Sequence, residues 1–165
     1  MLVGLNMEKG LMPKRWFYGH SYSGDMMSIS YQYEKPRELK EGERYLGNFI
    51  IPPFQRGLVW SLEQKQKLIH SIYVGLPIGS IVWNLNDSFY DTDWWLLDGQ
   101  QRVSTIISYM NGEFEFCGYR YPDLPKEEQA HFRRMPLSKI QTKITDPKVC
   151  EEIYNILIYG GTPHE

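Results

Sequence analysis

The residues with the clearest chemical potential form the run Asp98-Gly-Gln-Gln-Arg102, which follows an apolar stretch and opens a predicted helix. The first N–H groups of a helix lack internal acceptors, and the helix dipole adds partial positive charge there. Gly99 lets an anion approach the backbone, and the amides of Gln100 and Gln101 can order a water molecule or contact a base edge. The planar guanidinium of Arg102 suits phosphate oxygens. The run therefore predicts a phosphate cradle at the start of the helix.

The same residues allow a purely structural interpretation. Asp98 can cap the helix, and Gln101 would then stand three residues later, where it completes a capping box. Arg102 would pair with a nearby carboxylate instead of a ligand. Both interpretations stay open at the level of the sequence.

A second candidate is the pair Gln55-Arg56, which precedes a glycine in a proline-rich turn. Arg56 is the only basic residue between Arg44 and Lys65. An isolated arginine in an apolar setting needs an anionic partner. That partner is either a bound ligand or an acid of the protein such as Asp98, and the sequence favours neither.

A weaker candidate lies at the end of the chain, where Gly160, Gly161 and Thr162 could present backbone N–H groups to an anion. A helix C-cap followed by a turn explains these glycines without a ligand. The histidines and cysteines match no metal-ligand spacing, so no metal site is predicted from them.

The composition of the 165-residue chain fits one folded domain and excludes several classes of protein. A formal net charge of −2 provides no basic field for coating DNA or an anionic membrane. No apolar run reaches the roughly 18 residues of a membrane span, and two cysteines are too few for a disulfide scaffold. We therefore expect a cytoplasmic protein with no membrane contact. Aromatic residues make up 15% of the chain, and we expect them to build the core rather than a stacking site.

Periodicity and turn signals place the candidate residues on interleaved helices and strands, which predicts an α+β fold. A capping box of Ser61 and Gln64 begins a helix that ends near Gly75. Further helices are expected between Asp98 and Gly112, over residues 126–134, and from Pro147 after a capping Asp146. Strands are expected over residues 48–51, 80–84, 93–97 and 137–144, with a strand or hairpin over 113–121.

The start of the chain shows no clear periodicity. Residues 1–30 contain several glycines, and we expect them to form a loosely ordered lead-in to a domain that spans residues 31–165. A short strand is expected near residues 28–33.

Four segments, taken in order, resemble the DGQQR-motif domain of GmrSD-type modification-dependent restriction enzymes, which belongs to the ParB/sulfiredoxin-like superfamily. They are PFQRGLVW (residues 53–60), LIHSI (68–72), GLPIG (75–79) and LDGQQR (97–102). The terminal GGTP (160–163) resembles a further element of that family. The similarity covers roughly residues 45–165.

The resemblance implies an α+β, ParB/sulfiredoxin-like fold with a small mixed sheet and flanking helices. It also implies a site that binds a nucleoside triphosphate, often with hydrolysis, and nucleotide chemistry adds an expected Mg²⁺ ion. The catalytic residues would be Asp98, Gln101 and Arg102. The nucleotide-binding residues would be Gln55, Arg56, Gly99, Gln100, Gln101, Arg102, Gly160, Gly161 and Thr162.

These arguments predict a nucleotide-binding and NTP-hydrolysing domain linked to DNA restriction or to conflict between phage and host. Family enzymes that cut DNA usually continue into a nuclease domain, whereas this chain ends at Glu165, so DNA cleavage by this chain alone is not expected. A nuclease partner or a second copy of the chain would fit, and the short form resembles proteins encoded by phages. Two alternatives stay open: a non-enzymatic module that associates with DNA or a partner, and a metal-dependent ParB-like nuclease, against which the negative charge counts.

Overall fold

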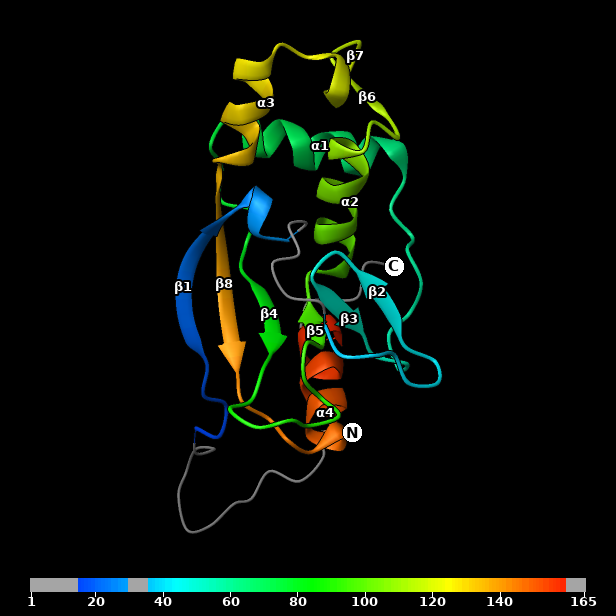
Figure 1. Cartoon of the computed structure of the whole chain (residues 1–165), viewed down its shortest axis with the longest axis vertical. Helices are drawn as coiled ribbons and strands as arrows, with labels where there is room; N and C mark the ends of the chain where they lie inside the picture. Colours follow the sequence, from blue (N-terminus) through cyan, green and yellow to red (C-terminus); the bar gives the residue numbers. More distant parts are fainter. Residues whose placement is uncertain (1–14, 30–35, 160–165) are drawn as a thin grey trace.

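A four-stranded mixed sheet forms the centre of the computed structural model, which describes residues 15–29 and 36–159 (Figure 1). Its strands stand in the order β1 (His20–Asp25), β8 (Pro136–Thr142), β4 (Ile81–Asn84) and β5 (Leu96–Asp98). β8 and β4 run parallel, and the other neighbouring strands run antiparallel. The predicted α+β class with a small mixed sheet is confirmed.

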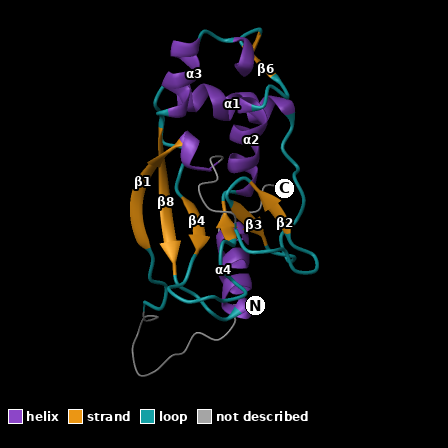
Figure 2. Ribbon diagram, viewed as in Figure 1, coloured by secondary structure: helices purple, strands orange, loops and turns teal. Residues whose placement is uncertain are grey.

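Within the described residues, four α-helices and two short hairpins accompany this sheet (Figure 2). Helices α1 (Leu62–Tyr73), α2 (Gln100–Met110) and α3 (Lys126–Arg133) gather at one end of the molecule, whereas α4 (Pro147–Tyr159) lies beside β5. One hairpin pairs β2 (Arg44–Leu46) with β3 (Phe49–Ile51), and the other pairs β6 (Glu115–Phe116) with β7 (Tyr119–Arg120). Two 3-10 turns, η1 (Met26–Ile29) and η2 (Tyr121–Asp123), complete the described elements.

The helix boundaries follow signals that are local in the sequence. Ser61 Oγ accepts a hydrogen bond from the Gln64 N–H, and Gln64 Oε1 accepts one from the Ser61 N–H, so the predicted capping box is confirmed. Past the end of α1, Gly75 adopts a φ of 77°, a conformation that glycine tolerates best. Asp146 Oδ1 accepts from the Lys148 N–H at the start of α4, as predicted.

Aromatic side chains fill much of the larger core, which lies between the helical end and the sheet. Tyr109 of α2 and Phe132 of α3 are buried with ring centroids 5.1 Å apart, and Tyr73 of α1 packs against both rings. A second core, which includes Val82, Leu97 and Ile153, lies between the sheet and α4. The predicted core role of the aromatic residues is confirmed for the larger cluster.

Part of the expected lead-in is ordered in the sheet, so the expectation of loose order is wrong there. β1 pairs with β8 from His20 opposite Gln141 to Asp25 opposite Pro136, and Met26 and Ile29 are buried. Residues 26–29 form η1 rather than the start of a strand, and residues 30–33 lie outside the described part. β1 escaped prediction because its residues are small or polar, and because its partner lies far along the chain.

The strand expected over residues 93–97 begins later, at Leu96. Residues 91–94 form a turn, and Trp94 adopts a φ of 69°, which an extended strand does not allow. The Trp94 N–H donates to the Asn84 carbonyl, and the Trp94 carbonyl accepts from the Ile50 N–H. This conformation therefore connects β5 to both β4 and β3.

The buried carboxylate of Glu43 joins the β2–β3 hairpin to β5. It accepts hydrogen bonds from Arg37 Nη1 and Nη2 (2.7 and 2.6 Å), the Lys40 N–H (2.7 Å) and the Trp95 indole (2.6 Å). Burial by itself would raise the pKa of Glu43, but these hydrogen bonds and the Arg37 charge hold the pKa below its ordinary value.

We expect the domain to lose stability in acid partly through Glu43. A carboxyl with a lowered pKa in the folded state stabilises the fold above its unfolded pKa, and this contribution disappears as the pH falls through the lowered value. Glu43→Gln should therefore reduce the free energy of unfolding at neutral pH and flatten its dependence on pH below about 5. Urea unfolding across pH checks this, with Glu41→Gln at an exposed neighbouring position as control. An unchanged slope in Glu43→Gln would contradict the assignment.

Candidate functional site

A cavity of about 200 Å³ opens where β5 turns into α2. It brings together the two segments that the sequence singled out, because Gln55 and Arg56 line it together with the whole run from Asp98 to Arg102. The remaining lining residues are Trp60, Leu97, Tyr154 and Ile158. Sequence reasoning missed Tyr154 and Ile158, since both lie on α4 and no motif marks them.

The turn from β5 into α2 depends on Gly99. Its φ is 103°, and a Cβ added there would lie 2.6 Å from Ile81 Cγ2 on the neighbouring strand. Gly99 is itself the N-cap, and no side chain of residues 15–29 or 36–159 caps the helix. The N–H groups that open α2 therefore remain available to a ligand that enters the cavity.

The predicted cap by Asp98 and the capping box with Gln101 are wrong. Asp98 belongs to β5, where it lies opposite Val82, and its carboxylate is used by another residue. A residue in a strand cannot also take the N-cap position that Gly99 occupies.

Arg102 acts as a connector inside the protein. Its Nη1 donates to the carbonyls of Ile78 (2.9 Å) and Ser80 (3.1 Å), and its Nη2 donates to Asp98 Oδ2 (2.9 Å). The side chain is 16% exposed. The structural interpretation, in which Arg102 pairs with a nearby carboxylate, therefore describes this side chain, and its guanidinium joins α2 to the segment before β4.

The side chains of Gln101 and Gln55 hold the loop over residues 55–60 against the cavity. Gln101 Oε1 accepts from the N–H groups of Val59 (3.1 Å) and Trp60 (3.3 Å), and its Nε2 donates to the Gly57 carbonyl (3.1 Å). Gln55 is buried, and its Nε2 donates to the Leu96 carbonyl. Both amides are thus used to position the loop that carries Arg56.

Arg56 and Gln100 differ from these residues. Arg56 is exposed, and its guanidinium makes no hydrogen bond or ion pair within the described part of the chain, including the ion pair with Asp98 considered above. Its backbone N–H donates to the Tyr154 hydroxyl at 3.2 Å, which fixes the backbone of the residue beside the cavity. Gln100 is only 8% exposed, yet its amide has no hydrogen-bond partner among residues 15–29 and 36–159. The amide atoms themselves are not fully buried, so they face the cavity and are open to a polar ligand.

Comparison with known proteins identifies the family of the chain. The family model of the GmrSD restriction endonuclease N-terminal domain matches residues 37–158 of the chain. The chain belongs to this family. The match confirms the resemblance noted in the sequence and links the GmrSD N-terminal domain to DNA restriction. No curated protein and no solved structure gives a significant match, so the ParB/sulfiredoxin-like assignment of the fold stays a prediction.

Three further sequence predictions concern the end of the chain, metal binding and the membrane. Gly160, Gly161 and Thr162 lie beyond the described residues. Among the residues that are described, no cluster of three His, Cys, Asp or Glu side chains suits a metal ion. None of the helices in the described part is long and apolar enough to cross a membrane.

Arg102→Ala should destabilise the GmrSD domain by about 1 to 2 kcal/mol, because two carbonyls and one carboxylate lose a largely buried donor. Lys67→Ala, which removes an exposed ion pair with Glu63 on α1, should change stability by less than about 0.5 kcal/mol. Urea unfolding of both variants measures the difference. Equal midpoints would show that Arg102 does not hold the junction together.

Proposed function

We propose that this GmrSD N-terminal domain binds a nucleoside triphosphate at the N-terminus of α2 and hydrolyses it. The observation that carries the proposal is that two unused groups, the Arg56 guanidinium and the Gln100 amide, line a helix N-terminus that no described side chain caps. Anions are stabilised at such helix ends by N–H groups and by the helix dipole. A polyphosphate would supply the anionic partner that the Arg56 guanidinium does not have within the described chain.

The residues that line the cavity would then have different roles. Arg56 would contact the phosphates from one side, and the N–H groups opening α2 would contact them from the other. Gln100 would hydrogen-bond a phosphate oxygen or orient the attacking water. Gln101 and Arg102 would act through position, since their side chains hold the loop and the strand that form the cavity.

Asp98 suits the Mg²⁺ ion that accompanies nucleoside triphosphates. One oxygen of its carboxylate accepts from Arg102, and the other has no partner within the described residues. Mg²⁺ is commonly held by one or two carboxylates together with substrate phosphates, and it neutralises charge on those phosphates. Asp98 would thus hold the ion at the wall of the cavity.

The proposal is tested by titrating the protein with ATP, GTP, CTP and UTP in the presence of Mg²⁺, and by measuring phosphate release with and without DNA. We expect at least one triphosphate to bind, and Gln100→Leu to weaken it by about two- to tenfold, the value of one neutral hydrogen bond. Gln66→Leu is the matched control, because the Gln66 amide donates to the Glu115 carbonyl and lies outside the cavity. Absence of binding, or equal loss in both variants, would remove the site. Binding without phosphate release would leave a nucleotide-controlled switch rather than an NTPase.

A further inference from the structure

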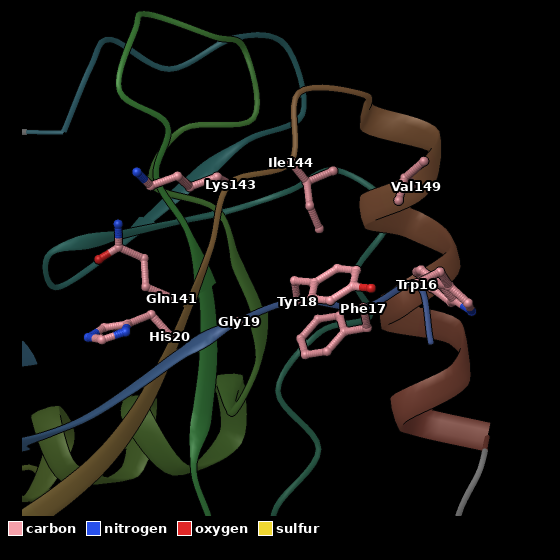
Figure 3. Close-up of a pocket in the computed structure, with 9 residues that line it drawn as sticks. All are labelled: Trp16, Phe17, Tyr18, Gly19, His20, Gln141, Lys143, Ile144 and Val149. Atoms are coloured by element: carbon pink, nitrogen blue, oxygen red, sulfur yellow. The ribbon is translucent and has the colours of Figure 1, made fainter. Parts of the chain in front are cut away.

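A second, larger cavity of about 660 Å³ contains no residue of the α2 N-terminus. It lies where the segment before β1 crosses the end of β8 and the start of α4 (Figure 3). Its aromatic wall comes from Trp16, Phe17 and Tyr18, which precede the region matched by the GmrSD family model. We call this cavity, with these three aromatic residues, the aromatic groove.

The aromatic wall is held close to the sheet by specific packing. Phe17 joins the core beneath α4, and Gly19 lies so near β8 that an added Cβ would clash with Ile140 Cγ2. Trp16 and Tyr18 nevertheless remain 50% and 66% exposed. The protein thus places two large exposed rings beside a cavity, an arrangement that a purely structural segment does not require.

The two ends of the aromatic groove differ in character. Figure 3 shows the Phe17 and Tyr18 rings near Ile144, whereas His20, Gln141 and Lys143 lie toward the other end. Gln141 Nε2 donates to the Leu85 carbonyl at 3.3 Å, which leaves its carbonyl oxygen without a partner in the described chain. One end therefore offers aromatic faces, and the other offers an amide acceptor and a cation.

Charge at the aromatic groove limits what can occupy it. The Arg15 guanidinium lies 4.9 Å from the centre of the Tyr18 ring, and Lys143 is paired with Asp87 at 2.7 Å. Two cations, one of them neutralised, do not provide the row of positive charge that a duplex backbone needs. A planar, uncharged group with one flanking phosphate matches this arrangement better, since bases stack on aromatic rings and Arg15 can contact a single phosphate.

We propose that the aromatic groove binds an unpaired base of DNA, stacked against Trp16 and Tyr18. The volume is in the range of cavities that enclose small ligands. Gln141 lies at the other end of the groove, where its carbonyl oxygen is open to a neighbouring nucleotide rather than to the stacked base. We choose DNA as the nucleic acid because the family is linked to DNA restriction. The inference is independent of the nucleotide site, because the two cavities share no residue.

The test uses fluorescence anisotropy of the full chain with three labelled DNAs: a single strand, a matched duplex, and the same duplex with one unpaired base. We expect the single strand and the duplex with the unpaired base to bind more tightly than the matched duplex. Trp16→Ala and Tyr18→Ala should each weaken binding by about fivefold or more, as for loss of one stacked base. Tyr119→Ala, at an exposed aromatic residue in the β6–β7 hairpin, should bind like the wild type.

Equal affinity for the three DNAs, no binding to any of them, or equal loss in Trp16→Ala and Tyr119→Ala would overturn the proposal. Thermal unfolding of the variants checks that the exposed rings are not needed for folding. Titration of Trp16→Ala with triphosphates should match the wild type. Failure of DNA binding can therefore be told apart from failure of the nucleotide site.

Discussion

Arg56→Ala is expected to weaken triphosphate binding by about ten- to a hundredfold, because the ligand loses a charge-assisted contact worth about 1.5 to 3 kcal/mol. The unfolding midpoint should stay unchanged, since the guanidinium is exposed and makes no contact within the described chain. Arg56→Lys keeps the charge but not the planar fork, so its affinity should fall between those of the wild type and the alanine variant. Calorimetric titration with each triphosphate and Mg²⁺ measures these differences.

Arg44→Ala provides the matched control for Arg56. Arg44 is an exposed arginine on β2 that lies outside the cavity, so its removal changes the net charge by the same amount. If both variants lose the same affinity, the effect comes from overall charge, and Arg56 does not contact the ligand. The loss in Arg56→Ala should also shrink at high salt, as expected for an exposed ionic contact.

Gly99→Ala is expected to destabilise the domain by about 2 to 6 kcal/mol, more than any other substitution considered. The φ of 103° alone costs an alanine about 1 to 3 kcal/mol. The contact of the new Cβ with Ile81 Cγ2, at 2.6 Å, adds about 1 to 3 kcal/mol of overpacking. Urea unfolding monitored by circular dichroism measures the sum.

Gly118→Ala separates these two contributions. Gly118 has a φ of 81° in the β6–β7 hairpin, and a Cβ there would meet no atom within 4 Å. This variant should show only the conformational part of the loss, about 1 to 3 kcal/mol. Equal losses in the two variants would mean that the approach of α2 to β4 does not require glycine at position 99.

The structure changes the roles that the sequence suggested for the side chains of the DGQQR run. Its two most obviously reactive side chains, Asp98 and Arg102, pair with each other at 2.9 Å, and Gln101 is used to hold the loop before α1. The groups left for a ligand are Gln100, the helix N-terminus and Arg56, which comes from another segment. A substitution of Arg102 would therefore mix loss of structure with loss of binding, whereas Arg56 and Gln100 separate the two.

The sequence by itself determined the helices and most strands of the centre, and it pointed to both segments that line the small cavity. These features depend on caps, glycines and periodicity, which act within a few residues, as the Ser61–Gln64 capping box illustrates. Only the tertiary structure decided the place of β1, the exposure of Trp16, and which polar atoms of residues 55–56 and 98–102 stay unused. Those outcomes depend on contacts between distant segments, because each hydrogen bond that Arg102 or Gln101 makes inside the protein removes one that a ligand could have made.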